Sequence, residues 1–200
     1  ARFAPLIHEM PSVAHCASTM MDVARTLGCV AVATEQYSKA FGPMVDELQH
    51  HLLYPSGSPR AHDASGGENG FTKVFEKSQF SMVTPPVMEH LAESFEGGGM
   101  TSAVLFGIEA HVCVQQTALD LLDLGIDVHI VTDATSSQRT KDRAYGLMRA
   151  QQAGAFLTTS ESIIFSLMRD SSHPEFKTVS GLLKEHNKFP NLLGVHSSER

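Results

Sequence analysis

Four short apolar runs, separated by stretches of helical periodicity, constrain the fold of this chain most strongly. A continuous apolar run bounded by turn residues is typical of a strand covered on both faces. Strands that alternate with helices predict a parallel sheet between two helical layers, a three-layer αβα, Rossmann-like fold. The runs are CVAVAT (29–34), AVLFGI (103–108), VHIVT (128–132) and AFLTT (155–159), and the helical patterns cover 13–27, 114–122, 141–152, 161–168 and 176–183.

Capping residues mark the ends of several predicted helices. Ser12 stands where an N-cap is expected, and Gly28 closes that helix. Thr158 and Glu161 have the spacing of a capping box, and Gly125 ends the helix that follows residue 113.

Length, charge and cysteine usage exclude several classes of protein. Two hundred residues fit one domain over 1–200, in which the Gly-, Ser- and Pro-rich stretch 54–70 is expected to be a flexible surface insertion. A formal net charge of −7 argues against a nucleic-acid partner, and no apolar run reaches the roughly 20 residues of a membrane helix. Three cysteines without CxxC spacing indicate a reducing, intracellular compartment, either cytosol or mitochondrion.

Cys113 stands where the run 103–108 passes into a helix. The carboxyl ends of parallel strands are where ligands bind, and the first turn of a helix favours a thiolate through its unpaired N–H groups and its dipole. A nucleophile and a small buried hydrophobic residue both fit this position.

Lys77 is the candidate partner of Cys113. It lies in FTKVFEKSQFSM (71–82) between Phe75 and Phe80, near the expected end of a strand. Lysines usually lie at the surface, so a solvated strand end is the alternative. A buried ammonium beside Cys113 would stabilise the thiolate.

The other polar residues predict no metal or nucleotide site, and no cofactor is expected. The eleven histidines show no HExxH motif and no close His/Asp cluster, and the adjacent His50 and His51 are expected to point apart. Asp133 is expected to organise a turn or to cap the next helix. No GxGxxG sequence follows a predicted strand.

Taken together, GIEAHVCVQQTALDLLDLGIDVHIVTDATSS, FEKSQFSM, TEQY and GAFLTTSESIIFSLMRDSSHPEFK resemble the isochorismatase-like cysteine hydrolases. The resemblance is to the eukaryotic isochorismatase-domain-containing subgroup and runs from about residue 2 to about residue 193. It implies a six-stranded parallel sheet, a homodimer or higher homo-oligomer, and a Cys–Lys–Asp triad that forms a thioester with a small amide, imide or related carbonyl compound.

The resemblance also implies site residues. Cys113 would be the nucleophile and Lys77 the triad lysine, with a cis peptide between Ile108 and Glu109. The backbone N–H groups of Glu109 and Cys113 would form the oxyanion hole. Three aromatic residues that follow predicted strand ends are candidates for either pocket walls or core packing: Tyr37, Phe41 and Phe80.

Two departures from the family pattern stand out. The metal-binding Asp and His of related nicotinamidases correspond here to Gln36 and Ser38, so that metal site is not expected. The family's first strand carries the triad aspartate, whereas this sequence begins with ARFAP, which resembles the residues just after that motif. We therefore expect about ten further residues upstream to supply the strand and the aspartate; otherwise Glu35 is the nearest carboxylate to propose.

Two readings of function follow. One is a metal-independent cysteine hydrolase with a small-molecule substrate. The other is a catalytically silent family member that binds a small ligand or a protein. Retention of both Cys113 and Lys77 favours the enzyme.

Overall fold

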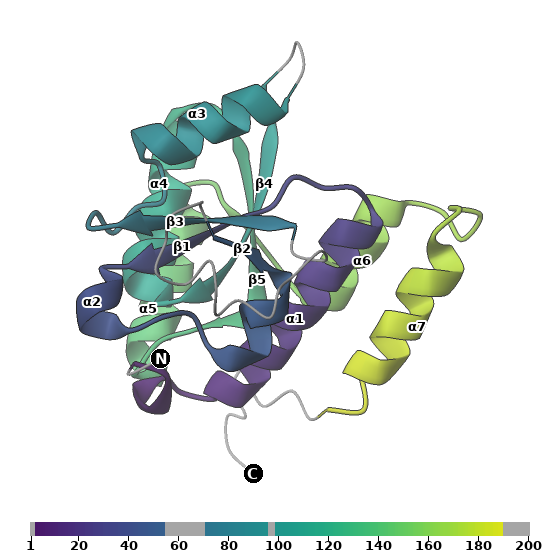
Figure 1. The fold of residues 1–200 in the computed structure, drawn as a ribbon, viewed down its shortest axis with the longest axis horizontal. Coiled ribbons are helices and arrows are strands. Elements are labelled where there is room, and N and C mark those ends of the chain that lie inside the picture. The colour runs from purple at the N-terminus through teal and green to yellow at the C-terminus, as the bar shows by residue number, and fades with distance from the viewer. Residues whose placement is uncertain (1–2, 55–70, 96–98, 190–200) are drawn as a thin grey trace.

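A computed structural model of the chain describes residues 3–54, 71–95 and 99–189. Apart from Tyr54, the expected insertion loop 54–70 lies outside these ranges. All strand pairs are parallel, and helices lie on both sides of the strands (Figure 1). In chain order the elements are η1 (Ala4–Leu6), α1 (Met10–Thr26), β1 (Val32–Gln36), α2 (Ser38–Phe41), η2 (Asp46–His51), β2 (Leu52–Leu53), β3 (Thr72–Lys77), α3 (Pro85–Ser94), β4 (Ser102–Ile108), η3 (Ala110–Val114), α4 (Gln115–Asp123), β5 (Asp127–Ser136), α5 (Thr140–Gln152), β6 (Phe156–Thr158), α6 (Ser160–Met168) and α7 (Phe176–His186).

The described strands form two three-stranded sheets, in the orders β1-β3-β2 and β4-β5-β6. The prediction of parallel strands flanked by helices is confirmed, but the prediction of one continuous six-stranded sheet is wrong for the described residues. They contain no counterpart of the family's first strand, which the resemblance places in the middle of the sheet. β1 and β4 each therefore end one of the two sheets.

The strand β1 begins three residues later than the apolar run 29–34 predicts. Gly28, at φ +68°, ends the turn after α1, and the N–H of Cys29 still donates to the carbonyl of Ala24. The strand continues instead through polar residues, so that Gln36 pairs in register with Lys77 of β3. This register places two polar side chains side by side at the carboxyl ends of neighbouring strands.

The helix α1 packs against both sheets. Its residues Cys16 and Met20 join a core with Val131 of β5 and with α6 and α7. Its Met21 joins a second core with Val74 of β3, and Phe106 of β4 packs against both cores. One long helix thus connects the two sheets, with α6 and α7 beside it in Figure 1.

The opposite face of the second sheet is covered by α4 and α5. Ala118 and Leu121 of α4 pack with Val128 and Ile130 of β5 and with Leu147 of α5. With α1, α6 and α7 on the other face, the second sheet is the middle of three layers, as predicted.

Local capping differs from the predictions in two places. The helix α1 begins at Met10 with Glu9 as N-cap, so Ser12 is not the cap but a buried residue of the first turn. Thr159, rather than Thr158, caps α6, because its hydroxyl accepts from the N–H of Ser162. The helix α3 begins with two prolines, which fix its start, and has no counterpart in the predictions. Within the described residues, none of the helices is long and apolar enough to cross a membrane.

Candidate active site

Lys77 is the last residue of β3, and its ammonium is held by oxygen atoms. The Nζ atom donates to the side-chain oxygen of Gln36 at 2.6 Å and to the carbonyls of Gln79 at 3.0 Å and Phe80 at 2.8 Å. The residue is only 7% exposed. The alternative that Lys77 is a solvated residue at a strand end is therefore wrong, because its side chain is buried and its ammonium donates to three oxygen atoms.

The fourth neighbour of the Lys77 ammonium is Cys113. Nζ lies 3.7 Å from Cys113 Sγ, within hydrogen-bonding distance for sulfur. Lys77 ends a strand of the first sheet, and Cys113 follows β4 of the second, so the contact joins the carboxyl ends of the two sheets. Cys113 is half-buried, so its thiol packs against the protein and is still accessible to a small molecule.

The charge on Lys77 follows from its partners. Burial lowers the pKa of Lys77, and the neighbouring Cys113 sulfur opposes that effect. All three oxygen partners are acceptors, so each requires a hydrogen from the lysine. An ammonium supplies three, whereas a neutral amine supplies only two. Lys77 is therefore arranged as a cation that donates, and not as a base.

Cys113 lies in η3, a single π-helical turn between β4 and α4. Its carbonyl accepts from the hydroxyl of Thr117 at 2.7 Å, and that hydroxyl in turn accepts from the N–H of Met82 at 2.9 Å. The segment after Lys77 is thereby tied to the helix that carries Cys113.

The chain around Glu109 is anchored on its other side. The peptide bond between Ile108 and Glu109 is cis, as the resemblance implies. The Glu109 carboxylate accepts from the N–H of Gln138 at 2.9 Å, and His111 Nδ1 lies 3.0 Å from the hydroxyl of Ser137. The predicted oxyanion hole, formed by the N–H groups of Glu109 and Cys113, stays a prediction.

Close helix packing also fixes this turn. A Cβ atom on Gly146 of α5 would lie 2.5 Å from the Cα of His111 and 2.9 Å from the carbonyl carbon of Ala110. Any larger residue would have to push η3 away, so this glycine allows α5 to support the turn that carries Cys113.

The three aromatic candidates are not core residues. Tyr37, Phe41 and Phe80 are 53%, 42% and 51% exposed. Phe41 makes an edge-to-face contact with Phe3 at 5.7 Å. Core packing is therefore excluded for these side chains, and a role as pocket walls stays a prediction.

Gln36 is the site residue that sequence reasoning missed. From the sequence, Gln36 was expected only to mark a position where the metal ligand of related nicotinamidases is lacking. In the structure its amide nitrogen donates to the carbonyl of Ser78 at 2.7 Å, which directs its oxygen at Lys77. Ser38 instead donates its N–H and hydroxyl to Glu76. The one sequence signal was the place of Gln36 in TEQY, at the expected end of a strand; its pairing with Lys77 is known only from the structure.

Glu35 faces away from the site, because neighbouring residues of a strand point to opposite faces. Its carboxylate accepts from the N–H of Met44 at 2.8 Å and from the hydroxyl of Tyr54 at 2.9 Å. Among the described residues, no carboxylate is in hydrogen-bonding contact with Cys113 Sγ. The candidate site therefore consists of a thiol, an ammonium and the groups that orient them.

Two clusters of potential metal ligands lie within the described residues, and the expectation that the protein has no metal site stays a prediction. The members of each come from distant parts of the sequence, which is why no spacing motif reveals them. One comprises Cys16, Asp133 and His186, and the other Asp22, His50 and His51.

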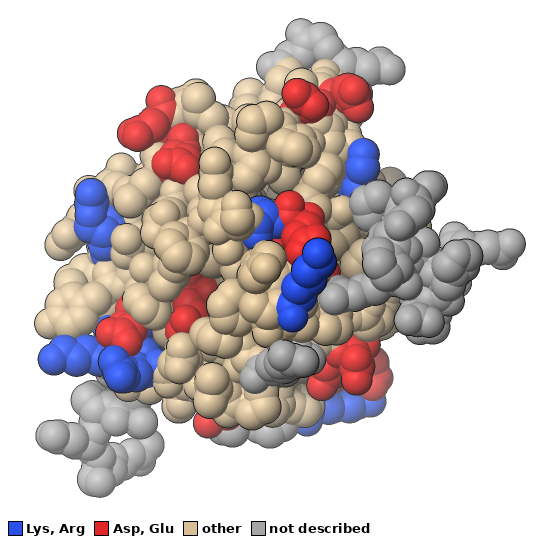
Figure 2. All heavy atoms as spheres, turned by 60° about the vertical axis from the view of Figure 1, so that its left-hand side comes forward, with Lys and Arg blue, Asp and Glu red and all other residues tan. Residues whose placement is uncertain are grey.

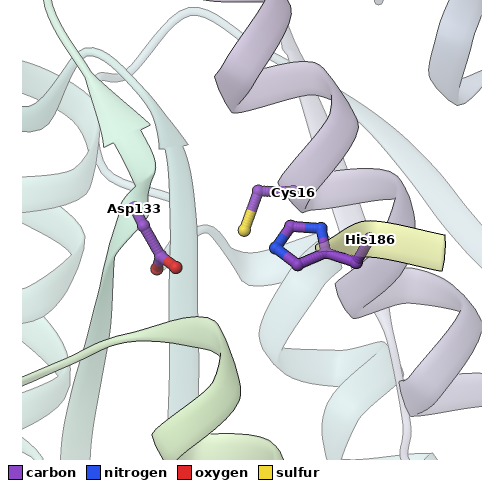
Figure 3. A group of neighbouring side chains, drawn as sticks. All are labelled: Cys16, Asp133 and His186. Atoms are coloured by element: carbon purple, nitrogen blue, oxygen red, sulfur yellow. The ribbon is translucent and has the colours of Figure 1, made fainter. Parts of the chain in front are cut away.

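In the first cluster, Cys16, Asp133 and His186 point toward one another from α1, β5 and α7 (Figure 3). Asp133 accepts from the N–H and the hydroxyl of Ser160, so it caps α6 and not the next helix along the chain. His186 Nδ1 lies 3.2 Å from the hydroxyl of Thr19. Burial, and then the Asp133 charge, raise the pKa of Cys16 to about 12. These partners make the cluster an internal polar network that fastens α6 and α7 to the core.

A cysteine and a lysine brought together at the carboxyl ends of parallel strands, within a three-layer α/β fold, define the class of isochorismatase-like hydrolases. A family model described as the isochorismatase domain matches residues 1–162. The chain belongs to the isochorismatase family.

Two relatives illustrate this membership. The chain is 42% identical over 189 residues to the secreted isochorismatase effector Isc1 of Phytophthora sojae, covering 94% of this chain and 82% of that protein. It is 40% identical over 183 residues to isochorismatase domain-containing protein 1 of Danio rerio, covering 92% of this chain and 57% of that protein. The chain therefore spans little more than half the length of the Danio rerio relative.

Solved structures share the fold. A Caenorhabditis elegans protein described as MAR1 ribonuclease is 36% identical, with a TM-score of 0.82 over 100% of this chain and 92% of that chain. The YcaC gene product of Escherichia coli, described as an octameric hydrolase of unknown specificity, is 18% identical, with a TM-score of 0.66 over 94% of this chain and 89% of that chain. At 18% identity, the similarity to YcaC shows only that the two proteins share a fold.

Proposed function

We propose that this protein is a metal-independent cysteine hydrolase that acts on a small amide, imide or related carbonyl compound through a thioester on Cys113. The observation that carries the proposal is the contact of 3.7 Å between the Lys77 ammonium and the Cys113 thiol. A buried cation in contact with a half-buried thiol places a positive charge beside the sulfur that would attack the substrate.

The chemistry proceeds in two steps. The Cys113 thiolate attacks the carbonyl carbon, the carbon–nitrogen bond breaks, and the nitrogen leaves with a proton. Water then attacks the thioester, which releases the acid and returns the thiol. Lys77 keeps its three hydrogens throughout, because three oxygens already accept them.

The proton of Cys113 therefore needs another acceptor. The resemblance assigns that role to the triad aspartate, which the family carries on its first strand. Glu35 does not replace it, since its carboxylate is bonded to Met44 and Tyr54. The N–H groups of Glu109 and Cys113 are the proposed donors to the oxyanion.

Gln36 supports the proposal of a reaction that requires no metal. Its oxygen accepts from the Lys77 ammonium, and its nitrogen donates to the Ser78 carbonyl. Both ends of the Gln36 side chain are therefore used to orient Lys77. In this proposal, the entrance to the active site is surrounded by the exposed rings of Tyr37, Phe41 and Phe80, which would contact the substrate.

Surface charge does not favour a polyanionic substrate. On the face shown in Figure 2, basic side chains are scattered among acidic ones and form no continuous basic surface. The formal net charge of −7 has the wrong sign for phosphate binding.

Assembly into a dimer or larger oligomer remains a prediction, and YcaC is described as an octamer. An intracellular location also remains a prediction, and Isc1 is described as secreted.

The test is the intact mass of the full-length protein after incubation with a panel of small amides and imides and, as a separate arm, an RNA oligonucleotide. The proposal predicts a mass increase from at least one compound, located at Cys113 by peptide mapping and absent in Cys113→Ala. Turnover of RNA without a protein adduct would favour a nuclease instead. No adduct and no turnover from any substrate would favour the catalytically silent binding module.

A further inference from the structure

The cluster of Asp22, His50 and His51 lies away from the candidate active site. Asp22 belongs to α1, and the two histidines end η2 just before β2. Leu52 pairs with Thr72, the first residue of β3, whereas Lys77 is the last residue of that strand. The cluster and the Cys113–Lys77 pair therefore lie at opposite ends of β3.

His51 is buried with one unpaired nitrogen. The residue is fully buried, and its Nδ1 atom has no hydrogen-bond partner. A buried polar atom without a partner is costly, so such an atom in a native protein requires an explanation. The nearest charged atom is Asp22 Oδ1, at 3.9 Å.

The other nitrogen of His51 is anchored. Its Nε2 lies 2.9 Å from the hydroxyl of Ser18. When Nε2 carries the hydrogen and Ser18 accepts it, the Nδ1 lone pair faces Asp22 and His50. Metal-binding histidines are oriented in this way, with the second ring nitrogen donating to a neighbour.

The three ligand atoms already lie close together. One nitrogen of each histidine and one oxygen of Asp22 lie within 4.8 Å of one another. Metal–ligand bonds of about 2.0–2.2 Å bring such atoms to roughly 3–3.5 Å from each other, so the side chains must close by about 1 Å. His50 is exposed and Asp22 half-buried, so both can move toward the fixed His51.

We propose that Asp22, His50 and His51 bind a divalent transition-metal ion of the zinc type, with His51 Nδ1 as the fixed ligand. Two imidazoles and one carboxylate suit zinc and its first-row neighbours and leave coordination positions for water. The ion would connect α1 to η2.

Arg25 competes with the ion in this arrangement. Its Nη2 atom donates to Asp22 Oδ1 at 2.7 Å, and its side chain is 42% exposed. A bound cation would displace the guanidinium, which can move into solvent. Removal of Arg25 should therefore strengthen metal binding, an effect that a merely structural role of the cluster does not produce.

The test is calorimetric titration of the whole protein with ZnCl2, using a Cys113→Ser background to remove the thiol of the candidate active site. We expect one ion per chain, binding at least tenfold weaker in Asp22→Asn and in His50→Gln. Arg25→Ala should tighten binding several-fold. His186→Asn, in the other cluster, should leave affinity unchanged. The half-buried Asp22 and the exposed His50 are replaced because replacement of the buried His51 could prevent folding.

A second measurement identifies the ligand atom. Nitrogen-15 NMR of the histidine rings should show a zinc-dependent shift at Nδ1 of His51, with Nε2 still carrying its hydrogen. No binding, or binding that is unchanged in both Asp22→Asn and His50→Gln, would overturn the proposal.

Discussion

Cys113 and Cys16 both lie beside an ionisable side chain, but the two neighbours carry opposite charges. Cys113 is half-buried and lies 3.7 Å from an ammonium. Cys16 is fully buried and faces the carboxylate of Asp133, and its pKa is raised to about 12. The comparison shows that burial beside a carboxylate keeps a thiol protonated, whereas partial exposure next to a cation makes a thiol a candidate nucleophile.

The largest effect should follow from removing the cation. Lys77→Met should slow alkylation of Cys113 by iodoacetamide at pH 7 by about 100-fold, because the thiolate loses an opposite charge within hydrogen-bonding distance. Rates are measured by peptide mapping. Lys73→Met, on the same strand, is the matched control and should leave the rate unchanged. Equal rates in wild type and Lys77→Met would show that the contact does not activate the thiol.

A smaller effect should follow from displacing the turn that carries Cys113. Gly146→Val should lower the free energy of unfolding by about 2 kcal/mol and slow Cys113 alkylation, because its side chain meets the backbone of η3. Gly181→Ala in α7 is the control. A Cβ there meets no atom within 4 Å, so this change should stabilise the protein by about 0.5–1 kcal/mol. A Gly146→Val protein with unchanged stability and reactivity would contradict this role of α5.

The smallest effect concerns Cys16 and alkaline pH. The pKa of this thiol rises from 9.0 to about 12 on folding, so the folded state retains a proton that the unfolded state loses above pH 9. Its contribution to stability is complete below pH 9 and is lost as the pH rises toward 12. We expect the free energy of unfolding to fall by about 1 kcal/mol between pH 9 and pH 10.

Urea denaturation at both pH values measures that change. Cys16→Ala should be less stable at pH 8 but should show a smaller loss between pH 9 and pH 10. If the two proteins lose the same free energy over that range, the buried thiol is not the group that titrates.

The fold and the central pair of the candidate site could be predicted because their signals are local. Apolar runs gave the strands of the second sheet to within a few residues, and Gly125 ended α4 as expected, with φ +76°. The resemblance carried by FEKSQFSM and by the segment around Cys113 implied the pairing of Lys77 with Cys113, and the position of Cys113 after the run 103–108 supported a site there.

The rest depends on contacts between distant residues. The role of Gln36 requires the register between β1 and β3, which pairs Gln36 with Lys77 and which no local sequence pattern predicts. His50 and His51 were expected to point apart, yet their rings lie 3.8 Å from each other at the end of a short 3-10 helix. Both metal-ligand clusters combine elements that no linear spacing connects.

The most direct test of the account is competition among the three cysteines for a limiting amount of iodoacetamide at pH 7, read out by peptide mass spectrometry. The account predicts that Cys113 is labelled first, Cys29 later because burial raises its pKa, and Cys16 only when the protein unfolds. Labelling of Cys29 as fast as Cys113 would contradict the claim that Lys77 prepares Cys113 as the nucleophile.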